Sequence, residues 1–180
     1  MVGLGSAAVL AIAVILGATG AFGGGNDSAT PTTTTSTTST PVSTGPQGFP
    51  LTEIKVKKSG SYQNTFAIQQ ALQPLLPRTQ ALYVTLAKKQ VVESAIKQAV
   101  TNKQPIFGVE GKTTFTGIVN PANASKNVIP IPLRASNGVN GSGAAALGVA
   151  SANQPFLDVR LSGVKPAPKG SAYIVWFVVA

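Results

Sequence analysis

The sequence contains no cysteine and no histidine. Without cysteine, the chain cannot form a disulfide scaffold, a thiolate metal site, an iron–sulfur cluster or a cysteine nucleophile. Without histidine, it lacks imidazole-dependent triads, histidine metal sites and histidine general bases. Only five acidic residues occur among 180, and they are Asp27, Glu53, Glu93, Glu110 and Asp158. Most common catalytic mechanisms are therefore excluded, and we expect a non-catalytic protein without a cofactor or a metal site.

Charge of both signs is scarce, and the balance is strongly basic. Charged residues make up 11% of the chain, yet the 14 basic residues leave a net charge of +9. Arginine occurs only at Arg78, Arg134 and Arg160, so lysine carries most of the positive charge. Lysine contacts anions as a point charge, whereas the planar guanidinium of arginine binds them through two parallel hydrogen bonds.

The longest uncharged apolar run lies at the start, from Val2 to Phe22. At 1.5 Å per residue such a helix is roughly 31 Å long, which matches the hydrocarbon core of a bilayer. We therefore expect residues 2–22 to contact membrane lipid as a single-pass helix. Whether it is a retained anchor or a cleaved signal stays open. No basic residue precedes Lys55, and Thr19-Gly20-Ala21 is only a tolerable cleavage site.

A Thr/Ser/Pro-rich segment follows, and Thr30–Thr44 reads TPTTTTSTTSTPVST. Such a composition cannot bury enough apolar surface to offset the entropy of ordering, so we expect a disordered linker. It is either a spacer that holds a domain away from the membrane or an inert linker. The order of apolar span, linker and domain predicts a cell-membrane protein with its C-terminal domain outside the cytoplasm.

The remaining chain is long enough for one ordinary domain. We expect an α+β fold: a transmembrane helix, a disordered linker and a small, mainly β, sandwich-like domain with one or two helices in its N-terminal part. The predicted divisions are 1–25 for the membrane helix, 26–48 for the linker and 49–180 for the domain, the last divided into an α/β part (49–104) and a β part (105–180).

In the α/β part, alternation predicts strands at Leu51–Lys57 and Ala81–Leu86. A short helix at Thr65–Leu72 would be capped by Asn64 and stopped by the prolines that follow. A longer helix is expected at Lys88–Lys103, with an apolar stripe and Pro105 after its end. A single helix from Thr79 is the alternative, but it would place Lys89 and Glu93 inside that stripe.

In the β part, Ile106–Val109 and Lys112–Val119 suggest a hairpin. The two prolines in Val128–Arg134 favour an edge strand or an extended segment. The Gly-rich run Gly138–Gly143 lacks the Lys-Ser/Thr of a phosphate-binding loop, so we interpret it as a hairpin loop. Further strands are expected at Ala144–Ala150, Phe156–Leu161 and Ala172–Val179. The last strand is almost continuously apolar, so it should be central.

The segment from Leu133 to Val179, about a quarter of the chain, contains a Leu-x-Val-x-Leu-x-Gly turn pattern followed by Tyr-x-Val-Trp. It resembles the C-terminal extracytoplasmic β-domain of bacterial membrane-bound anti-sigma factors. The matching positions are Leu157, Val159, Leu161, Gly163, Val164, Pro166, Tyr173, Val175, Trp176 and Phe177. The resemblance implies that Tyr173 and Trp176 are core aromatics. It does not extend to sigma-factor binding, and it implies either a shorter variant of the domain or a piece of a longer protein.

The candidate binding residues are lysines in three clusters, which are Lys55, Lys57 and Lys58, then Lys88 and Lys89, then Lys165 and Lys169. If one face collects them, an anionic polymer of the cell envelope or lipid headgroups would be the natural partner. A solvated surface is the simpler alternative. Nucleic-acid binding is not expected, because arginine is rare and the aromatics resemble core residues. Asp158 and Arg160 lie two apart on one strand, which predicts a solvated ion pair.

These patterns predict a membrane-anchored, extracytoplasmic module of a bacterial envelope with a sensory, binding or structural role. Two alternatives stay open: the extracytoplasmic half of an anti-sigma-type regulator, and a binder of anionic envelope polymer. An envelope hydrolase would need two carboxylates among Glu93, Glu110 and Asp158 to meet, which nothing in their spacing requires.

Overall fold

The computed structural model describes residues 45–150 and 153–179. The predicted membrane span at Val2–Phe22 and the linker up to residue 44 lie outside these ranges. Among the described helices, none has the length and apolar character needed to cross a bilayer.

The domain is mainly β. Its strands are β1 (Gln47–Ile54), β2 (Tyr62–Ala67), β3 (Thr79–Lys88), β4 (Phe107–Gly108), β5 (Lys112–Ile118), β6 (Val128–Ala135), β7 (Ser142–Val149), β8 (Pro155–Ser162) and β9 (Ser171–Val179). The helical elements are the α-helix α1 (Lys89–Thr101) and the 3-10 segments η1 (Gln70–Arg78) and η2 (Pro121–Asn123).

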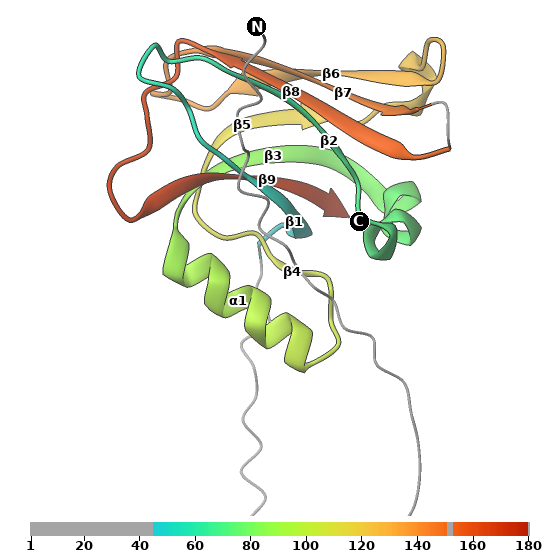
Figure 1. Cartoon of the computed structure of the whole chain (residues 1–180), viewed down its shortest axis with the longest axis horizontal. Coiled ribbons are helices and arrows are strands. Elements are labelled where there is room, and N and C mark those ends of the chain that lie inside the picture. Colours follow the sequence, from blue (N-terminus) through green and yellow to red (C-terminus); the bar gives the residue numbers. More distant parts are fainter. Residues whose placement is uncertain (1–44, 151–152, 180) are drawn as a thin grey trace, which may run out of the picture.

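The strands form one antiparallel sheet in the order β2-β8-β7-β6-β5-β3-β9-β1-β4. The sheet curls over, so that β2, β8, β7 and β6 form one layer above β5, β3, β9 and β1, and α1 lies against the far side of the lower layer (Figure 1). Strands β1, β2 and β3 pair with β9 and β8, so residues before and after position 105 share the same sheet.

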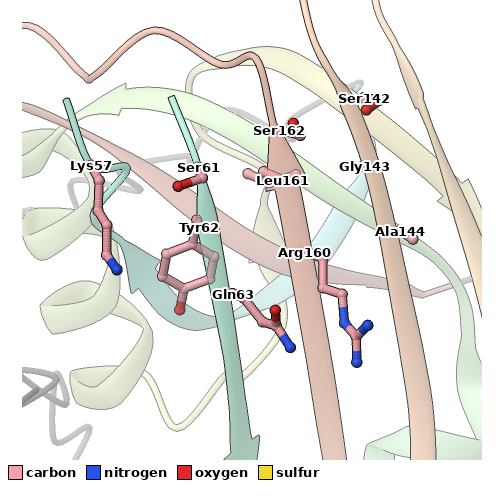
Figure 2. A pocket seen from close by; sticks show the side chains of 10 residues that line it. All are labelled: Lys57, Ser61, Tyr62, Gln63, Ser142, Gly143, Ala144, Arg160, Leu161 and Ser162. Atoms are coloured by element: carbon pink, nitrogen blue, oxygen red, sulfur yellow. The ribbon is translucent and has the colours of Figure 1, made fainter. Parts of the chain in front are cut away.

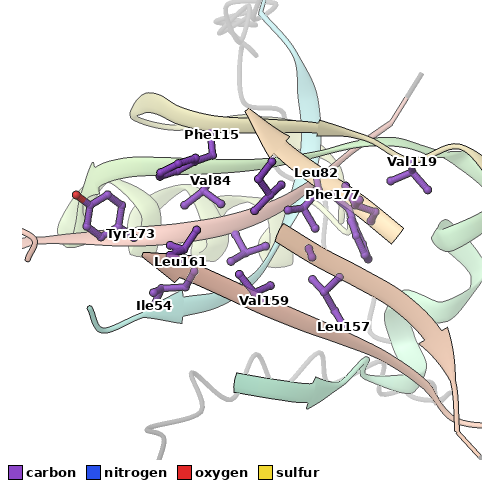
Figure 3. Close-up of a cluster of buried hydrophobic side chains, with 14 of the residues drawn as sticks. Ile54, Leu82, Val84, Phe115, Val119, Leu157, Val159, Leu161, Tyr173 and Phe177 are labelled. Atoms are coloured by element: carbon purple, nitrogen blue, oxygen red, sulfur yellow. The ribbon is translucent and has the colours of Figure 1, made fainter. Parts of the chain in front are cut away.

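Strand β9 lies between β3 and β1 and has a buried side chain at every position after Ser171. Because side chains alternate between the faces of a strand, its two faces enter two clusters. Tyr173, Val175 and Phe177 join the main core between the layers. Figure 3 shows Leu82 beside Phe177, with Val84 farther along β3 toward Tyr173. Trp176 faces the other way, toward α1. The central position predicted for Ala172–Val179 is confirmed.

The second cluster is small and lies under the helix. It contains Ala87, Val92, Ala172, Ile174 and Trp176, with Ile96 and Phe107 packed against it. The Phe107 ring meets Trp176 edge-on, with 5.5 Å between the ring centroids. The Trp176 indole Nε1–H donates to Thr85 Oγ1 at 3.0 Å. Tyr173 and Trp176 are therefore core aromatics, as expected.

The helix predicted at Lys88–Lys103 is confirmed as α1, and the strand before it is confirmed as β3. Val92 and Ala99 of its stripe are buried, whereas Val100 stays 45% exposed. The loop predicted at Gly138–Gly143 joins β6 to β7, as expected.

The short helix predicted at Thr65–Leu72 is wrong. Its first residues belong to β2, which pairs with β8 from Tyr62 to Ala67. The segment has a period of two, because Tyr62 and Phe66 pack against the main core. The Asn64 side chain accepts only from the neighbouring Thr65 N–H, which is not a helix cap.

The prolines expected to stop that helix, Pro74 and Pro77, lie inside η1. A proline inside an α-helix removes an i→i−4 hydrogen bond and clashes with the preceding turn. The segment is therefore not an α-helix, and η1 has 3-10 geometry with i→i+3 hydrogen bonds in place of the i→i−4 bonds that the prolines would interrupt.

The predicted hairpin between Ile106–Val109 and Lys112–Val119 is also wrong. Strand β4 pairs with the start of β1, through Gln47↔Gly108 and Gly48↔Phe107. Strand β5 pairs instead with β3 over most of its length. The contact between Phe107 and Trp176 favours this arrangement, because it partly buries the Phe107 ring against the fully buried indole.

Two further predictions need correction, one about where the linker ends and one about the place of a strand in the sheet. Gln47 and Gly48, assigned to the linker, belong to β1, and a side chain at Gly48 would collide with the Phe177 carbonyl. The segment Val128–Arg134, expected to be an edge strand or an extended segment, forms β6, which lies between β7 and β5. It meets β5 only at Arg134 and Ala135, so its prolines at 130 and 132 pair with β7 alone. This one-sided pairing accommodates the missing N–H groups.

Candidate functional site: a basic end and an adjoining groove

Because every pairing is antiparallel, strand ends that are far apart in the sequence meet at the same end of the sheet. At one such end, four paired residues form a row across β1, β9, β3 and β5. They are, in that order, Ile54, Tyr173, Leu86 and Lys112. The loops that leave this row join β1 to β2, β3 to α1, β4 to β5 and β8 to β9. They lie at the left of Figure 1.

These loops carry all seven lysines that the sequence singles out. Lys55, Lys57 and Lys58 follow β1, Lys88 and Lys89 join β3 to α1, and Lys165 and Lys169 join β8 to β9. We call these residues, together with Lys112, the basic end. The three predicted clusters are therefore brought to one end of the domain.

Backbone hydrogen bonds tie the loops of the basic end to one another. The Lys89 N–H donates to the Gly170 carbonyl at 3.1 Å, which joins the start of α1 to the loop before β9. The Val164 N–H donates to the Gly60 carbonyl at 3.0 Å, which joins the β8–β9 loop to the β1–β2 loop. The Tyr173 hydroxyl donates to the Lys165 carbonyl at 2.9 Å. The lysines thus project from a connected set of loops rather than from independent ones.

Negative charge at or near the basic end comes from Glu53, Glu110 and Glu93, the last of which lies one helical turn after Lys89 in α1. Lys89 Nζ lies 2.6 Å from Glu53 Oε1, and both side chains are partly accessible. The other seven lysines of the set are exposed, and they form no further salt bridge within residues 45–150 and 153–179. Exposed lysines that share an end of the domain repel one another, and an anionic partner relieves that repulsion.

An open groove with several polar side chains adjoins the basic end on the outer face of β2, β8 and β7. Its volume is about 530 Å³, and its lining residues are Lys57, Ser61, Tyr62, Gln63, Ser142, Gly143, Ala144, Arg160, Leu161 and Ser162. The register explains the hollow: Gln63, Arg160 and Ala144 form one row, and Ser162 and Ser142 form the next. Small side chains on β7 and at the end of β8 leave space beside the longer Gln63 and Arg160 (Figure 2).

Arg160 is held in place by a chain of polar contacts on the same outer face. Its Nε lies 2.9 Å from Asp158 Oδ2, and Thr65 Oγ1 donates to Asp158 Oδ1 at 3.1 Å. The Arg160 side chain stays 62% exposed, against 15% for Asp158. The ion pair predicted for Asp158 and Arg160 is therefore present and solvent-accessible on the arginine side.

Tyr62 lines the groove near Lys57 and also packs against the core. Burial raises the pKa of its phenol above 10.0, and a hydrogen bond from the Asn64 side chain opposes that effect in part. The hydroxyl is therefore protonated at neutral pH and is able to donate a hydrogen bond.

Carboxylates are not gathered into a metal-binding cluster in the described ranges, where no group of three or more acidic side chains occurs. Glu53 lies on β1 opposite Ile174, whereas Asp158 lies on the outer face of the other layer. These two acids are therefore on different layers of the domain.

Sequence reasoning missed Lys112 and the groove. Lys112 is isolated in sequence, and only its pairing with Leu86 places it at the basic end. The groove residues come from β2, β7 and β8, and β2 was mistaken in part for a helix. The alternation of Tyr62, Asn64 and Phe66 was the signal that could have identified that strand.

Comparison with known proteins finds no family model, no curated protein and no solved structure that matches the chain. The candidate site therefore rests on its own geometry.

Proposed function

We propose that this chain is a membrane-anchored, extracytoplasmic binding module whose ligand is an anionic polymer of the cell envelope. The observation that carries the proposal is the collection of eight lysines from four loops at one end of the domain. Against them stand Glu53, which is already paired with Lys89, Glu110, and Glu93 one helical turn into α1. A repeating anion suits such a surface because it contacts several dispersed point charges at once.

The mechanism is electrostatic attraction followed by multiple weak contacts. Each exposed lysine near an anionic surface contributes about 1 kcal/mol, and the sum weakens as salt screens it. The connected loops limit the conformational entropy lost on binding, because hydrogen bonds already hold them together. The apolar run at residues 2–22 and the linker after it would hold this surface near the membrane.

The binding test uses the full chain in a mild detergent, with inorganic polyphosphate, polygalacturonate and neutral dextran as probes. The basic-end variant replaces Lys55, Lys57 and Lys58 by glutamine. The control variant replaces Lys97, Lys103 and Lys126, which are exposed and lie outside the basic end. Both variants lose the same charge, so the comparison separates the basic end from the net charge of the protein.

We expect the chain to bind both anionic probes at low salt and to ignore dextran. The basic-end variant should bind at least about tenfold more weakly, because three lysine contacts are lost. The control variant should change by less than about threefold, since distant exposed charges are screened. Equal losses for the two variants, or no retention of either anionic probe at low salt, would overturn the proposal.

The proposed topology has its own test, which is protease treatment of intact cells followed by blotting with an antibody to residues 49–180. We expect the signal to disappear while a cytoplasmic control protein survives. Protection in intact cells together with cleavage in lysates would place the domain in the cytoplasm and would require a cytoplasmic anionic partner instead.

A further inference from the structure

The groove beside the basic end has a different chemistry from the lysines. Its outer-face lining combines neutral hydrogen-bonding groups, from Ser61, Ser142, Ser162 and Gln63, with the cations of Lys57 and Arg160. A hydroxyl both donates and accepts, and a primary amide does the same with separate atoms. A ligand that carries only anionic oxygens would use the donors of these groups but not their acceptors. A ligand with hydroxyl groups and one acidic group would use all of them.

Arg160 supplies the most specific contact in the groove. Asp158 engages its Nε, and the two terminal nitrogens make no hydrogen bond to residues 45–150 or 153–179. Asp158 is itself fixed by Thr65, so the guanidinium is oriented before a ligand arrives. A planar pair of N–H donors matches a carboxylate and binds it in a bidentate manner.

The groove also has a suitable size and position. Its volume of about 530 Å³ lies within the range of small-ligand sites. Lys57 belongs both to the groove and to the basic end, so a polymer can pass from one to the other without interruption. The Tyr62 ring adds an amphipathic surface near Lys57, as Figure 2 shows.

We propose that the groove binds one acidic sugar unit of an anionic polysaccharide, with Arg160 holding the carboxylate and the serines and Gln63 contacting the hydroxyl groups. This inference rests on the proposed function, because it identifies the class of polymer that the basic end would attract. Thr65 and Asp158 are positioning residues in this site, since they act on the ligand through Arg160.

The test compares polygalacturonate with polyphosphate as probes of the full chain in detergent. The variant R160K keeps the charge and removes the planar fork. The control variant R78K makes the same change at an exposed arginine in η1, at the opposite end of the domain. We expect R160K to weaken polygalacturonate binding about tenfold, which is the scale of one charge-assisted bidentate contact. Polyphosphate binding should change by less than about threefold, because this polymer has no hydroxyl groups for the serines and Gln63 to contact and is held mainly by the dispersed lysines of the basic end.

A second variant, T65V, checks the positioning role. It leaves Arg160 and its charge intact but removes the hydroxyl that fixes Asp158. We expect a smaller loss for polygalacturonate, of about threefold, together with no change for polyphosphate. Rescue by T65S, which retains the hydroxyl, would identify the hydrogen bond as the cause.

The outcomes separate this inference from the proposed function. If R160K weakens both probes equally, or leaves polygalacturonate binding unchanged, the acidic-sugar site is overturned while the basic end stands. If replacing Lys55, Lys57 and Lys58 by glutamine has no effect on the binding of either probe, the proposed function is overturned, and the inference that rests on it is overturned as well.

Discussion

The interior around β9 and the basic end lie next to each other in the same domain, yet they differ in almost every physical respect. Around β9 the side chains are buried and apolar, and the Trp176 indole is paired with Thr85. At the basic end most side chains are exposed lysines. Within the described ranges, one of these lysines, Lys89, forms a salt bridge, and its partner is Glu53. Stability is therefore concentrated in one region and the proposed binding in the other.

Stability and polymer binding should therefore respond to different substitutions. Loss of a buried side chain leaves a cavity and removes transfer free energy, so folding suffers directly. Loss of an exposed lysine removes little packing, and it even reduces repulsion within the basic end. The Tyr173 hydroxyl lies at the junction of the two regions, because it joins β9 to the Lys165 carbonyl.

The largest expected effect belongs to Trp176→Ala. Trp176 is fully buried, contacts Phe107 edge-on and donates to Thr85. The free energy of unfolding should fall by about 3–5 kcal/mol, as is typical of a buried tryptophan replaced by alanine. Urea unfolding followed by circular dichroism measures it, because Trp176 is the only tryptophan and its fluorescence is lost with the substitution.

The matched contrast is the variant that replaces Lys55, Lys57 and Lys58 by glutamine. Its free energy of unfolding should stay within about 0.5 kcal/mol of the original, since these side chains are exposed. A destabilisation close to that of Trp176→Ala would remove the distinction between the two regions. It would also mean that weaker polymer binding by this variant reflects partial unfolding.

A smaller effect is expected for Tyr173→Phe. The substitution removes the hydroxyl that donates to the Lys165 carbonyl, so the free energy of unfolding should fall by about 1 kcal/mol at neutral pH. No loss at all would show that the β8–β9 loop is held by other contacts, such as the bond between Val164 and Gly60.

The same tyrosine predicts a pH dependence. Burial raises the pKa of Tyr173 above 10.0 in the folded state. Its contribution to stability is therefore complete below pH 10.0 and is lost as the pH rises through the folded-state pKa. Unfolding at about pH 8 and about pH 11 should show a steeper loss for the original chain than for Tyr173→Phe. Identical slopes would assign the alkaline loss to other groups, of which Tyr62 is the first to test by Tyr62→Phe.

Local patterns in the sequence were sufficient where one element decides its own structure. The apolar stripe of α1 and the continuous apolar run of β9 identified both elements, because burial on one face or on two faces leaves a direct periodic signature. The loop before β7 was predictable from its glycine-rich composition, and the strands that follow it were predictable from their apolar residues. Composition alone also removed catalysis through cysteine or histidine from consideration.

Pairing between distant segments was beyond the reach of those patterns. The short segment at Phe107 pairs with β1 rather than with its neighbour β5, since only the folded chain offers it Trp176 as a partner. Tyr62–Ala67 is a strand because β8 is available to pair with it across more than ninety residues of sequence. Tertiary contacts of this kind override local helix signals.

Side-chain chemistry and local periodicity are properties of the chain, so they already indicated which residues carry charge and which are buried. The sequence named seven lysines without showing that they meet. Only the tertiary structure decided that they do, because antiparallel pairing returns the ends of β1, β3 and β8 to the same end of the sheet. The same pairing placed Arg160 beside Gln63 and created a groove that no single segment of the sequence contains.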